Sequence, residues 1–436
     1  MSKAETKDLV AVEDLDAYQS GLHGPDWLRA LRASALERFN ATEWPTMQEE
    51  EWRRTNLSPF EFDIYSLPEV QSAMAPPGTL PATDGWAGRL VYENGSIAGA
   101  TLRPELADAG VVFGDLLTAV TADSPAAIAV RAAMEGSHAE ADNRLEHWHF
   151  AMLASAAVLY VPANVAVAEP FEIDLRFGGD EIVQAPHLVV IIERGADVSL
   201  VRRIASSDEG EVLVVDGSEL VVGDGARLSL LCLQRLNDEA VVFSNDRGRL
   251  GRDAHIHRTE AALGADFVKA RYISDLVGAG ADAVLNGLYF TSEEQHVDLR
   301  TVQRHRAPNT TSRAYYRGTV ADESHAIYQG LIQVDAAGRG TDAYLTNKNL
   351  VLGEEARADS IPSLNINTDD VRCSHGSTTG KLDPEQVFYL RSRGYRKAEA
   401  VRVLVEGYYE DLIEQTVEPV RDELRELIVA RISQDD

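Results

Sequence analysis

The sequence predicts a mainly β protein whose core is a parallel, right-handed β-helix, flanked by an N-terminal helical and mixed region and a C-terminal helical region. From about Val158 to Ile366, short runs of Val, Ile, Leu and Tyr alternate with Gly, Asp and Asn, a pattern typical of strands and turns. Four of these runs open on an alanine, at intervals of 30, 28 and 27 residues: Ala196, Ala226, Ala254 and Ala281. This period, with no amphipathic helix between the runs, indicates a solenoid of strands and turns. A β-sandwich with coincidental spacing is the alternative.

The N-terminal region is expected to cover residues 1–150. Asp26 is placed to cap a helix whose apolar residues recur at the 3.6-residue period. These residues are Trp27, Leu28, Leu31, Leu36 and Phe39. Thr46 and Glu49 have the spacing of a capping box, and Pro59 ends the run that follows. From there to about Arg144 the chain is rich in Ala, Gly and Pro, and its topology stays open.

The β-helix core is expected over residues 151–380 and the C-terminal helical region over residues 381–436. Asp383 is placed as a helix cap, Pro384 suits the first helical position, and Gly394 is placed to end the helix. A longer helix with one apolar face follows, and a last one begins near Pro419. The apolar face holds Ala400, Val401, Leu404, Val405, Tyr408, Leu412 and Ile413. Such faces normally cover the protein's own core, although they can also bind a partner.

Composition excludes several classes of function. The net charge of −29, from 70 acidic and 41 basic residues, repels nucleic acid. The longest apolar runs are far shorter than the roughly 20 residues that cross a bilayer, so we expect no membrane partner. The start, MSKAETKDLV, lacks the apolar segment of a signal peptide. Two cysteines in 436 residues favour the reducing cytoplasm over a disulfide-linked protein.

Several short motifs resemble functional sites but do not fit their context. The run GSTTGK from Gly376 has the wrong spacing for a phosphate loop, and GAGADA from Gly278 precedes a strand-like run instead of the helix that dinucleotide binding requires. Cys232 lies in an apolar run and is expected to be inert. The pairs His147 with His149 and His255 with His257 have the i, i+2 spacing of metal ligands on a strand, but we favour surface or core roles.

A carbohydrate-cleaving β-helical enzyme is the rival hypothesis from another class. Sugar hydrolysis uses two facing carboxylates, and Asp298, Glu293 and Glu294 could supply them. The polar segment around them, which includes His296, His305 and Ser312, is more typical of side chains that stack between turns of a solenoid. Nothing in the sequence shows that these carboxylates lie close together in the folded chain.

The segment from Asp369 to Gly380, DDVRCSHGSTTG, combines a cysteine and a histidine at the predicted boundary between strand and helix. Because strand side chains alternate, Cys373 and His375 would point to the same face. Thiolate and imidazole together suit a soft metal such as iron, zinc or copper. Two ligands do not complete a site, since an iron–sulfur cluster normally takes about four.

The run PSLNINTDDVRCSHGSTTGKLDPEQVFYLRSRG, from Pro362 to Gly394, closely resembles the C-terminal hallmark of the SufB/SufD family of iron–sulfur cluster assembly proteins. Further runs agree in order: WLRALRASALERF, PTMQEEEWRRTNLSP, LYVPANVAVAEPFEI and HVDLRTVQRHRAPNTTSRAYYRG. The resemblance spans nearly the whole chain. Ser374, His375 and Gly376 give the SufD form of the hallmark, whereas the TTGK after it leans slightly toward SufB. The run from Asn347 to Leu350 lacks the cysteine that SufB carries there.

The resemblance implies a scaffold subunit that is not an enzyme, in the cytoplasm. Its partners would be a SufB-type chain, or a second copy when alone, and the SufC ATPase bound to the C-terminal helices. His375 would be the cluster or iron ligand at the SufB interface, with Cys373 as a second candidate or a packing residue. The cluster would be transient, shared with SufB and absent from the isolated chain. Candidate SufC-binding residues are Phe388, Leu390, Leu404 and Tyr408. A SufB-like scaffold that holds the cluster itself is the alternative within the family, and flavin binding stays open.

Overall fold

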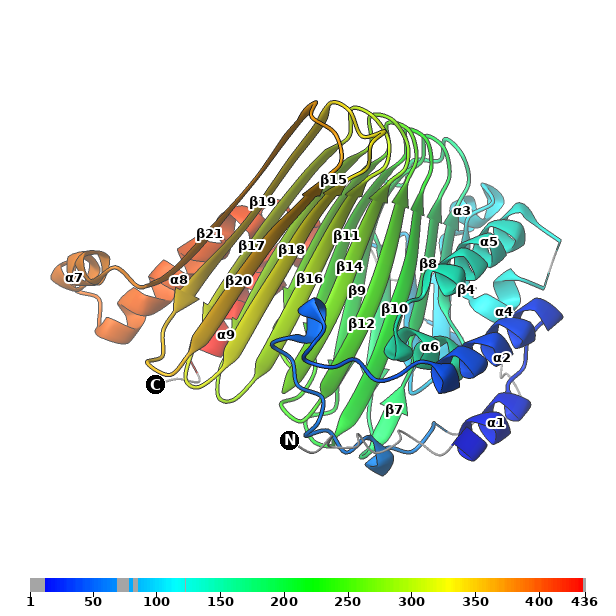
Figure 1. Cartoon of the computed structure of the whole chain (residues 1–436), viewed down its shortest axis with the longest axis horizontal. Coiled ribbons are helices and arrows are strands. Elements are labelled where there is room, and N and C mark those ends of the chain that lie inside the picture. The colour runs from blue at the N-terminus through cyan, green and yellow to red at the C-terminus, as the bar shows by residue number, and fades with distance from the viewer. Residues whose placement is uncertain (1–11, 69–77, 81–84, 122, 434–436) are drawn as a thin grey trace.

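The computed structural model describes residues 12–68, 78–80, 85–121 and 123–433 and shows a β-solenoid with helices at both ends of the chain (Figure 1). Two long sheets form its opposite walls, and nearly all neighbouring strands in each wall are parallel. The fold therefore confirms the predicted class, and the β-sandwich alternative is wrong.

The first wall is an eleven-stranded sheet. In spatial order its strands are β1 (Gly78–Thr79), β3 (Ser96–Leu102), β2 (Gly88–Glu93), β6 (Phe171–Phe177), β9 (Asp197–Ser206), β11 (Arg227–Arg235), β13 (His255–Ala262), β15 (Asp282–Thr291), β17 (Thr311–Val320), β19 (Thr341–Val351) and β21 (Val371–Lys381). Because odd-numbered strands from β9 onward pair with odd-numbered ones, each turn of the chain adds one strand to this wall.

The second wall is a ten-stranded sheet. It runs through β20 (Arg357–Ile366), β18 (His325–Val334), β16 (His296–His305), β14 (Phe267–Leu276), β12 (Val241–Leu250), β10 (Val212–Val222), β8 (His187–Ile192), β5 (Ala157–Val161) and β4 (Val112–Asp115), with β7 (Ile182–Gln184) beside β10. The side chains between the two walls form the main hydrophobic core.

The repeated alanines mark equivalent corners of successive coils. The N–H groups of Arg227, His255 and Asp282 donate to the carbonyl oxygens of Ala196, Ala226 and Ala254 at 2.8, 2.9 and 2.9 Å. The four alanines are at most 1% exposed. A small side chain is required there because each corner packs directly on the next. The repeat that predicted the solenoid is thus its structural period.

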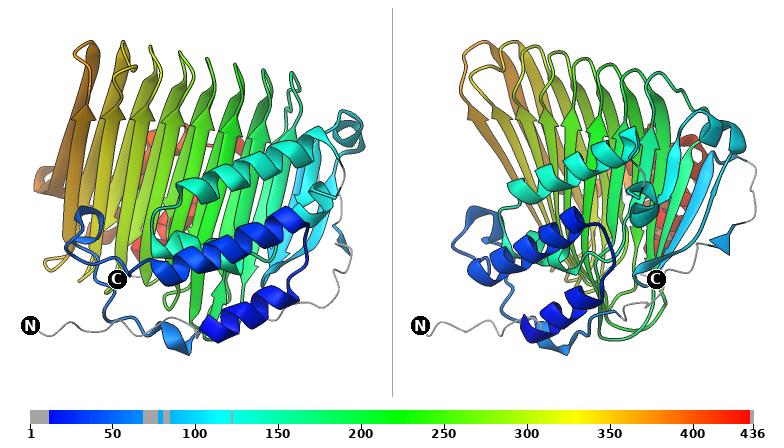
Figure 2. Two further views of the ribbon diagram at one scale, coloured as in Figure 1. Left: turned by 45° about the vertical axis from the view of Figure 1, so that its right-hand side comes forward. Right: turned by 90° about the vertical axis from the view of Figure 1, so that its right-hand side faces the viewer.

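Helices of the N-terminal region cover the outer face of the ten-stranded sheet (Figure 2). They are α1 (Val12–Gly21), α2 (Asp26–Ala41), α4 (Leu116–Ala119), α5 (Pro125–Glu140) and α6 (Arg144–Met152), with the short 3₁₀ helices η1 (Glu50–Trp52) and η2 (Phe62–Ile64). The short helix α3 (Pro104–Asp108) instead packs Leu106 against the main core. Leu28, Leu31, Leu36 and Phe39 of α2 are buried in this layer, as the stripe predicted, whereas Trp27 is only partly buried.

Two local predictions in the N-terminal region need correction. Pro25, not Asp26, occupies the cap position of α2, and Asp26 lies in its first turn. Thr46 and Glu49 form a turn, in which the Thr46 N–H donates to Glu49 at 2.9 Å, instead of starting an α-helix.

The core role favoured for His147 and His149 is confirmed, since both side chains are buried. They lie on α6, where residues two apart point in different directions, so they do not share a face as metal ligands on a strand would.

The C-terminal helices are α7 (Pro384–Ser392), α8 (Lys397–Ile413), η3 (Glu418–Val420) and α9 (Arg421–Ser433). Asp383 caps α7 by accepting from the Glu385 N–H, and Gly394 follows it with φ of 101°, so both helix signals are confirmed. Helices α8 and α9 pack on the outer face of the eleven-stranded sheet and bury Val405, Tyr409 and Leu424. Helix α7 buries none of its residues. Whether the three regions are separate domains stays a prediction.

Candidate functional site

The last coil of the solenoid, formed by β20 and β21, ends both walls. Among the described residues, each of these strands pairs on one side only, with β18 and β19 respectively, and both lie at one end of the solenoid in Figure 1. Their other edges carry backbone N–H and C=O groups without a strand partner, which is the usual template for pairing with another chain. The solenoid is therefore open at this end.

Cys373 and His375 lie on β21 and face the inside of this open coil. Their register partners on β19 are Ala343 and Leu345, whose side chains are buried in the core. Since aligned residues of parallel strands point the same way, Cys373 and His375 continue the core side of the wall. Cys373 packs against the core and is partly buried, whereas His375 is exposed. The prediction that the two share a face is confirmed.

The two donors differ in their readiness to bind a metal. Burial raises the pKa of the Cys373 thiol, so the thiol is protonated at neutral pH, whereas a ligand must be a thiolate. His375 is exposed, and an imidazole binds a metal without carrying a negative charge. Within the described residues, no three His, Cys, Asp or Glu side chains lie close enough together to hold a metal ion. His375 and Cys373 are thus at most part of a site.

The facing strand β20 gives the open end an apolar side. Ala358 and Ser360 are the register partners of the core residues Ala326 and Tyr328, so this alternation also points Leu364 and Ile366 inward. With no further coil above them, Leu364 and Ile366 are 40% and 36% exposed. Apolar side chains at an unpaired sheet end are typical of an interface.

The run from Asn347 to Leu350 lies on β19, one strand away from β21. Asn347 and Asn349 point into the core, where Asn347 Nδ2 donates to the Tyr289 hydroxyl at 2.9 Å and Asn349 Nδ2 to Asn347 Oδ1 at 2.8 Å. An amide network therefore occupies the place at which the resemblance implies a missing cysteine.

Comparison with known proteins gives the family of the chain. Residues 175–408 match the family model described as SUF system FeS cluster assembly, SufBD core domain. The chain belongs to the SufBD family. It is 35% identical over 291 residues to an iron–sulfur cluster assembly SufBD family protein of Mycobacterium tuberculosis. The aligned residues cover 65% of this chain and 72% of the relative. It is also 26% identical over 434 residues to the iron–sulfur cluster assembly protein SufD of Bacillus subtilis, covering 98% of this chain and 99% of the relative. The SufD protein of Escherichia coli is 30% identical over 244 residues, 56% of this chain and 57% of the relative.

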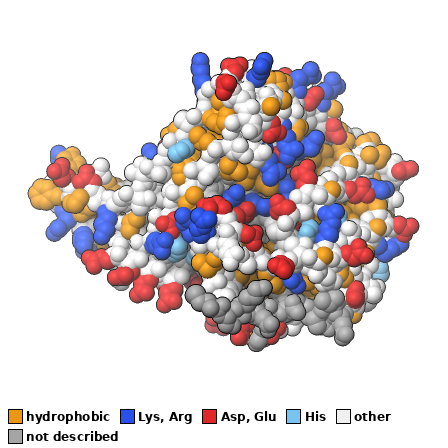
Figure 3. Space-filling model, viewed as in Figure 1, with side chains coloured by type: hydrophobic (Ala, Val, Ile, Leu, Met, Phe, Trp, Pro, Cys, Tyr) orange, Lys and Arg blue, Asp and Glu red, His pale blue; other side chains and the backbone are white. Residues whose placement is uncertain are grey.

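The candidate partner-binding residues of this SufBD-family chain fall into two environments. Phe388 on α7 is 72% exposed, and Leu390 on the same helix is partly exposed. In Figure 3, this helix forms a lobe that projects from the body and carries hydrophobic side chains. Leu404 and Tyr408 on α8 are partly buried instead, and the Tyr408 hydroxyl donates to the Lys348 carbonyl at 2.6 Å. Tyr408 therefore already helps α8 to pack on the solenoid.

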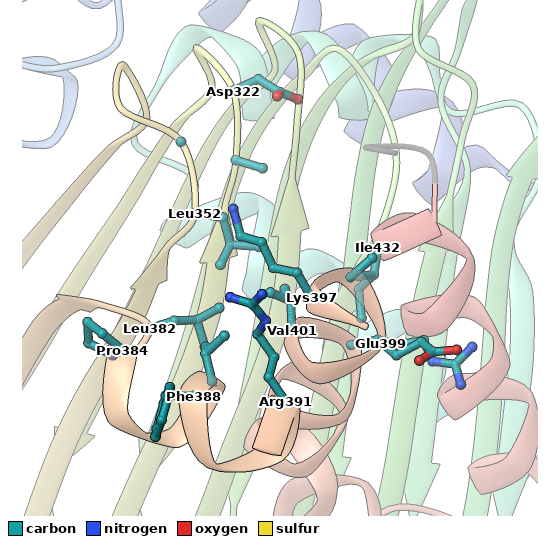
Figure 4. Close-up of a pocket in the computed structure, with 15 residues that line it drawn as sticks. Asp322, Leu352, Leu382, Pro384, Phe388, Arg391, Lys397, Glu399, Val401 and Ile432 are labelled. Atoms are coloured by element: carbon teal, nitrogen blue, oxygen red, sulfur yellow. The ribbon is translucent and has the colours of Figure 1, made fainter. Parts of the chain in front are cut away.

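A hollow of about 890 Å³ lies between α7, the start of α8 and the turns beside β17 and β19 (Figure 4). Leu352, Val401 and Ile432 give its body side apolar character, and Val387 and Phe388 line it from α7. This hollow explains why α7 buries no residue: the helix stands away from the surface it faces.

The carboxylates of the carbohydrate hypothesis do not form a catalytic pair. Asp298 is fully buried and bound by Lys269 Nζ at 2.7 Å and by Gln329 Nε2 at 3.0 Å. Glu293 and Glu294 lie in the exposed turn before β16. A buried carboxylate held by a cation cannot act as an acid or base on a sugar without breaking that pair.

The remaining motifs have structural roles. GSTTGK lies in β21 and forms no phosphate loop, and GAGADA leads into strand β15 instead of the helix that dinucleotide binding requires. His305 bonds to the hydroxyls of Thr310 and Ser312, both at 2.8 Å, as expected for stacked turns. His255 contacts Asp282, which satisfies the ring without a metal. In the described part of the chain, no helix is long and apolar enough to cross a membrane.

Sequence reasoning missed a cluster of charges inside the solenoid. Arg202 pairs with Asp216, and Arg258 pairs with both Asp246 and Glu260. Burial raises the pKa of Glu260 to about 7 and that of the nearby Cys232 thiol well above its usual value. The signal was present, since arginines occupy alternate positions of strand runs where apolar residues are expected. Cys232 is buried as predicted.

Proposed function

We propose that this chain is a SufD-type scaffold subunit, without enzymatic activity of its own, in a complex with a SufB-type chain and the SufC ATPase. The family and its relatives support a role in iron–sulfur cluster assembly. The cluster would be cargo that is built at the open end of the solenoid and handed on. The expected compartment is the reducing cytoplasm, which fits two cysteines that are both free.

The observation that carries the proposal is the incomplete pair of donors at an open sheet end. Cys373 and His375 lie on the core side of the last coil, which no further coil covers, and the described residues offer no third ligand beside them. A second chain that pairs with β20 and β21 would bring further ligands to the same place. A SufB-type chain fits this role because the buried amides of Asn347 and Asn349 leave this subunit without a thiolate of its own there.

The imidazole of His375 supports cluster transfer by its chemistry. It is a competent iron ligand, but weaker than thiolate, and a weaker ligand suits a cluster that must leave. Cys373 is the second candidate, and its raised pKa favours a packing role until a metal or partner displaces the thiol proton.

The C-terminal helices would bind the ATPase. Phe388 and Leu390 lie on the projecting helix α7, which follows β21 after Leu382 and Asp383 only. A pull on α7 is therefore applied close to the strand that carries His375. ATP-driven movement of the bound ATPase could open the interface in this way.

The test is joint expression with a SufB-type and a SufC-type chain, followed by purification and analysis of iron and sulfide. The proposal predicts a stable complex that gains a labile cluster, whereas the isolated chain gains none. Failure of the three chains to purify together would overturn it. A cluster held by the isolated chain would favour the SufB-like alternative.

A further inference from the structure

Helix α7 presents one amphipathic face to the body of its own chain. Pro384, Val387, Phe388 and Arg391 all line the hollow. Their spacing of i, i+3, i+4 and i+7 is that of a helix stripe made to be buried. None of these side chains is buried in the structure, and Phe388 remains 72% exposed. The stripe thus faces a surface that it does not touch closely.

The opposite wall of the hollow is complementary to this stripe. Its apolar part consists of Leu352, Val401 and Ile432, and Asp322 lies at its far end (Figure 4). Arg391 extends from α7 toward this wall, and a second cation, Lys397, also lines the hollow (Figure 4). The Asp322 carboxylate accepts only a backbone N–H, from Glu293 at 2.9 Å, among the bonds of the described residues. Closure would therefore bring apolar residues against apolar ones and leave a carboxylate available to the two cations.

Both ends of α7 permit a rigid-body swing. The helix is joined to β21 by Leu382 and Asp383, and to α8 by residues 393–396. Gly394, with φ of 101° and open space around its Cβ position, is the conformationally free residue of the second joint. Hinges of this kind need only a few residues at the ends of an element.

We propose that α7 is a hinged arm that closes over the hollow in the free chain and opens when a partner binds. Closure removes Phe388 and Val387 from water, which favours the closed state. A partner that binds Phe388 can do so only in the open state and shifts the population toward it. The arm thereby hides the apolar partner surface until the partner arrives. Its role as a partner switch rests on the proposed function, but its closure does not.

The test is a distance measurement between spin labels on the isolated full-length chain. Labels at Gln386→Cys on α7 and Glu354→Cys beyond β19 would report closure, because both residues are exposed and neither lines the hollow. Cys373→Ser removes the accessible native thiol, and Cys232 is buried. Glu426→Cys on the packed helix α9, paired with Glu354→Cys, is the matched control.

We expect two distances for the Gln386 pair, one of them shorter than in the structure, and a single distance for the control. Phe388→Asp should remove the shorter distance, since it puts a charge into the apolar contact. A single distance for the Gln386 pair that equals the distance in the structure, or a broad distribution that Phe388→Asp does not change, would overturn the arm. Adding SufC should also remove the shorter distance. If the arm closes but SufC has no effect, the proposed partner role fails while the arm stands.

Discussion

His375 on β21 lies in register with Leu345 on β19, one coil further into the solenoid. Leu345 is fully buried, so the imidazole occupies the position that a core side chain would take if another coil followed. A polar imidazole at an unfinished core position is costly to cover with the chain's own apolar residues. This relationship supports our proposal that another chain completes the end of the solenoid and that His375 belongs to that contact.

Phe388→Ser should weaken binding of the SufC-type ATPase and leave folding intact. Losing a buried phenylalanine contact costs about 1.5–3 kcal/mol, which is about a 10- to 100-fold loss of affinity. Because Phe388 is 72% exposed in the structure and closure of α7 involves only one peripheral helix, the melting temperature of the variant should change little. Calorimetric titration measures the affinity. Ile128→Ser on α5, at 66% exposure, is the control and should not change it. Equal affinities for both variants would contradict the role of α7.

Removal of all residues after Leu382 would test the binding of the ATPase less cleanly than Phe388→Ser. Helices α8 and α9 cover apolar side chains on the outer face of the eleven-stranded sheet, among them Leu231, Leu288 and Phe290. Without the helices this face would be exposed, and we expect the truncated solenoid to aggregate. Light scattering of the truncated chain checks this. A monodisperse truncated protein would show that the sheet does not need its cover.

Asp298→Asn should destabilise the fold because it leaves the Lys269 ammonium buried without its counter-charge. Lys269 and Asp298 side chains are 4% and 0% exposed. Breaking a buried pair of this kind costs about 3–5 kcal/mol, whereas the exposed pair Arg131 with Glu135 should contribute about 0.5 kcal/mol or less. Urea unfolding of Asp298→Asn and of the control Glu135→Gln measures both. Polysaccharide cleavage that is lost in Asp298→Asn while stability is retained would instead favour the carbohydrate hypothesis.

Acid should unfold the protein through its buried histidines. Burial lowers the pKa of His149 to about 3 and those of His296 and His305 to about 4, so these rings stay neutral in the folded chain. In the unfolded chain they take up protons below about pH 6.5. Stability is therefore fully present above pH 6.5 and is lost as pH falls toward 4, by about 1.4 kcal/mol per pH unit for each ring. Urea unfolding between pH 7 and 4.5 checks this. His305→Gln should reduce the slope, and a stability that is constant over this range would contradict the assignment.

The parts of the fold that follow from local pattern could be predicted from sequence. The spacing of Ala196, Ala226 and Ala254 reflects stacked corners, and the helix signals are local, since Asp383 caps α7 with its own side chain and Gly394 ends it with its own backbone conformation. The layer between Pro59 and Arg144 could not be predicted, because its short strands pair with residues distant in sequence, such as β2 with β6. The position of Arg202 among core residues could be seen in the sequence, but its pairing with Asp216 could not, since only the coil brings the two together.

The two donor residues of the candidate site could be predicted from the sequence, but their surroundings could not. The i, i+2 spacing placed Cys373 and His375 on one face, and the resemblance to the family implied their role. That β21 ends the wall, and that α7 stands away from the body, are properties of the complete fold. Neither the exposure of Leu364 nor the hollow beside Phe388 has a signal in the local sequence.

The most direct test of the account is the cluster content of the complex that carries His375→Ala. Complexes with the SufB-type and SufC-type chains would be purified in parallel for the native chain, for His375→Ala and for the control Ser374→Ala, whose side chain points to the other side of β21. Iron and acid-labile sulfide per complex are then measured after reconstitution. We predict that all three complexes form and that only His375→Ala loses most of its iron and sulfide. A normal cluster content in the intact His375→Ala complex would contradict the central claim.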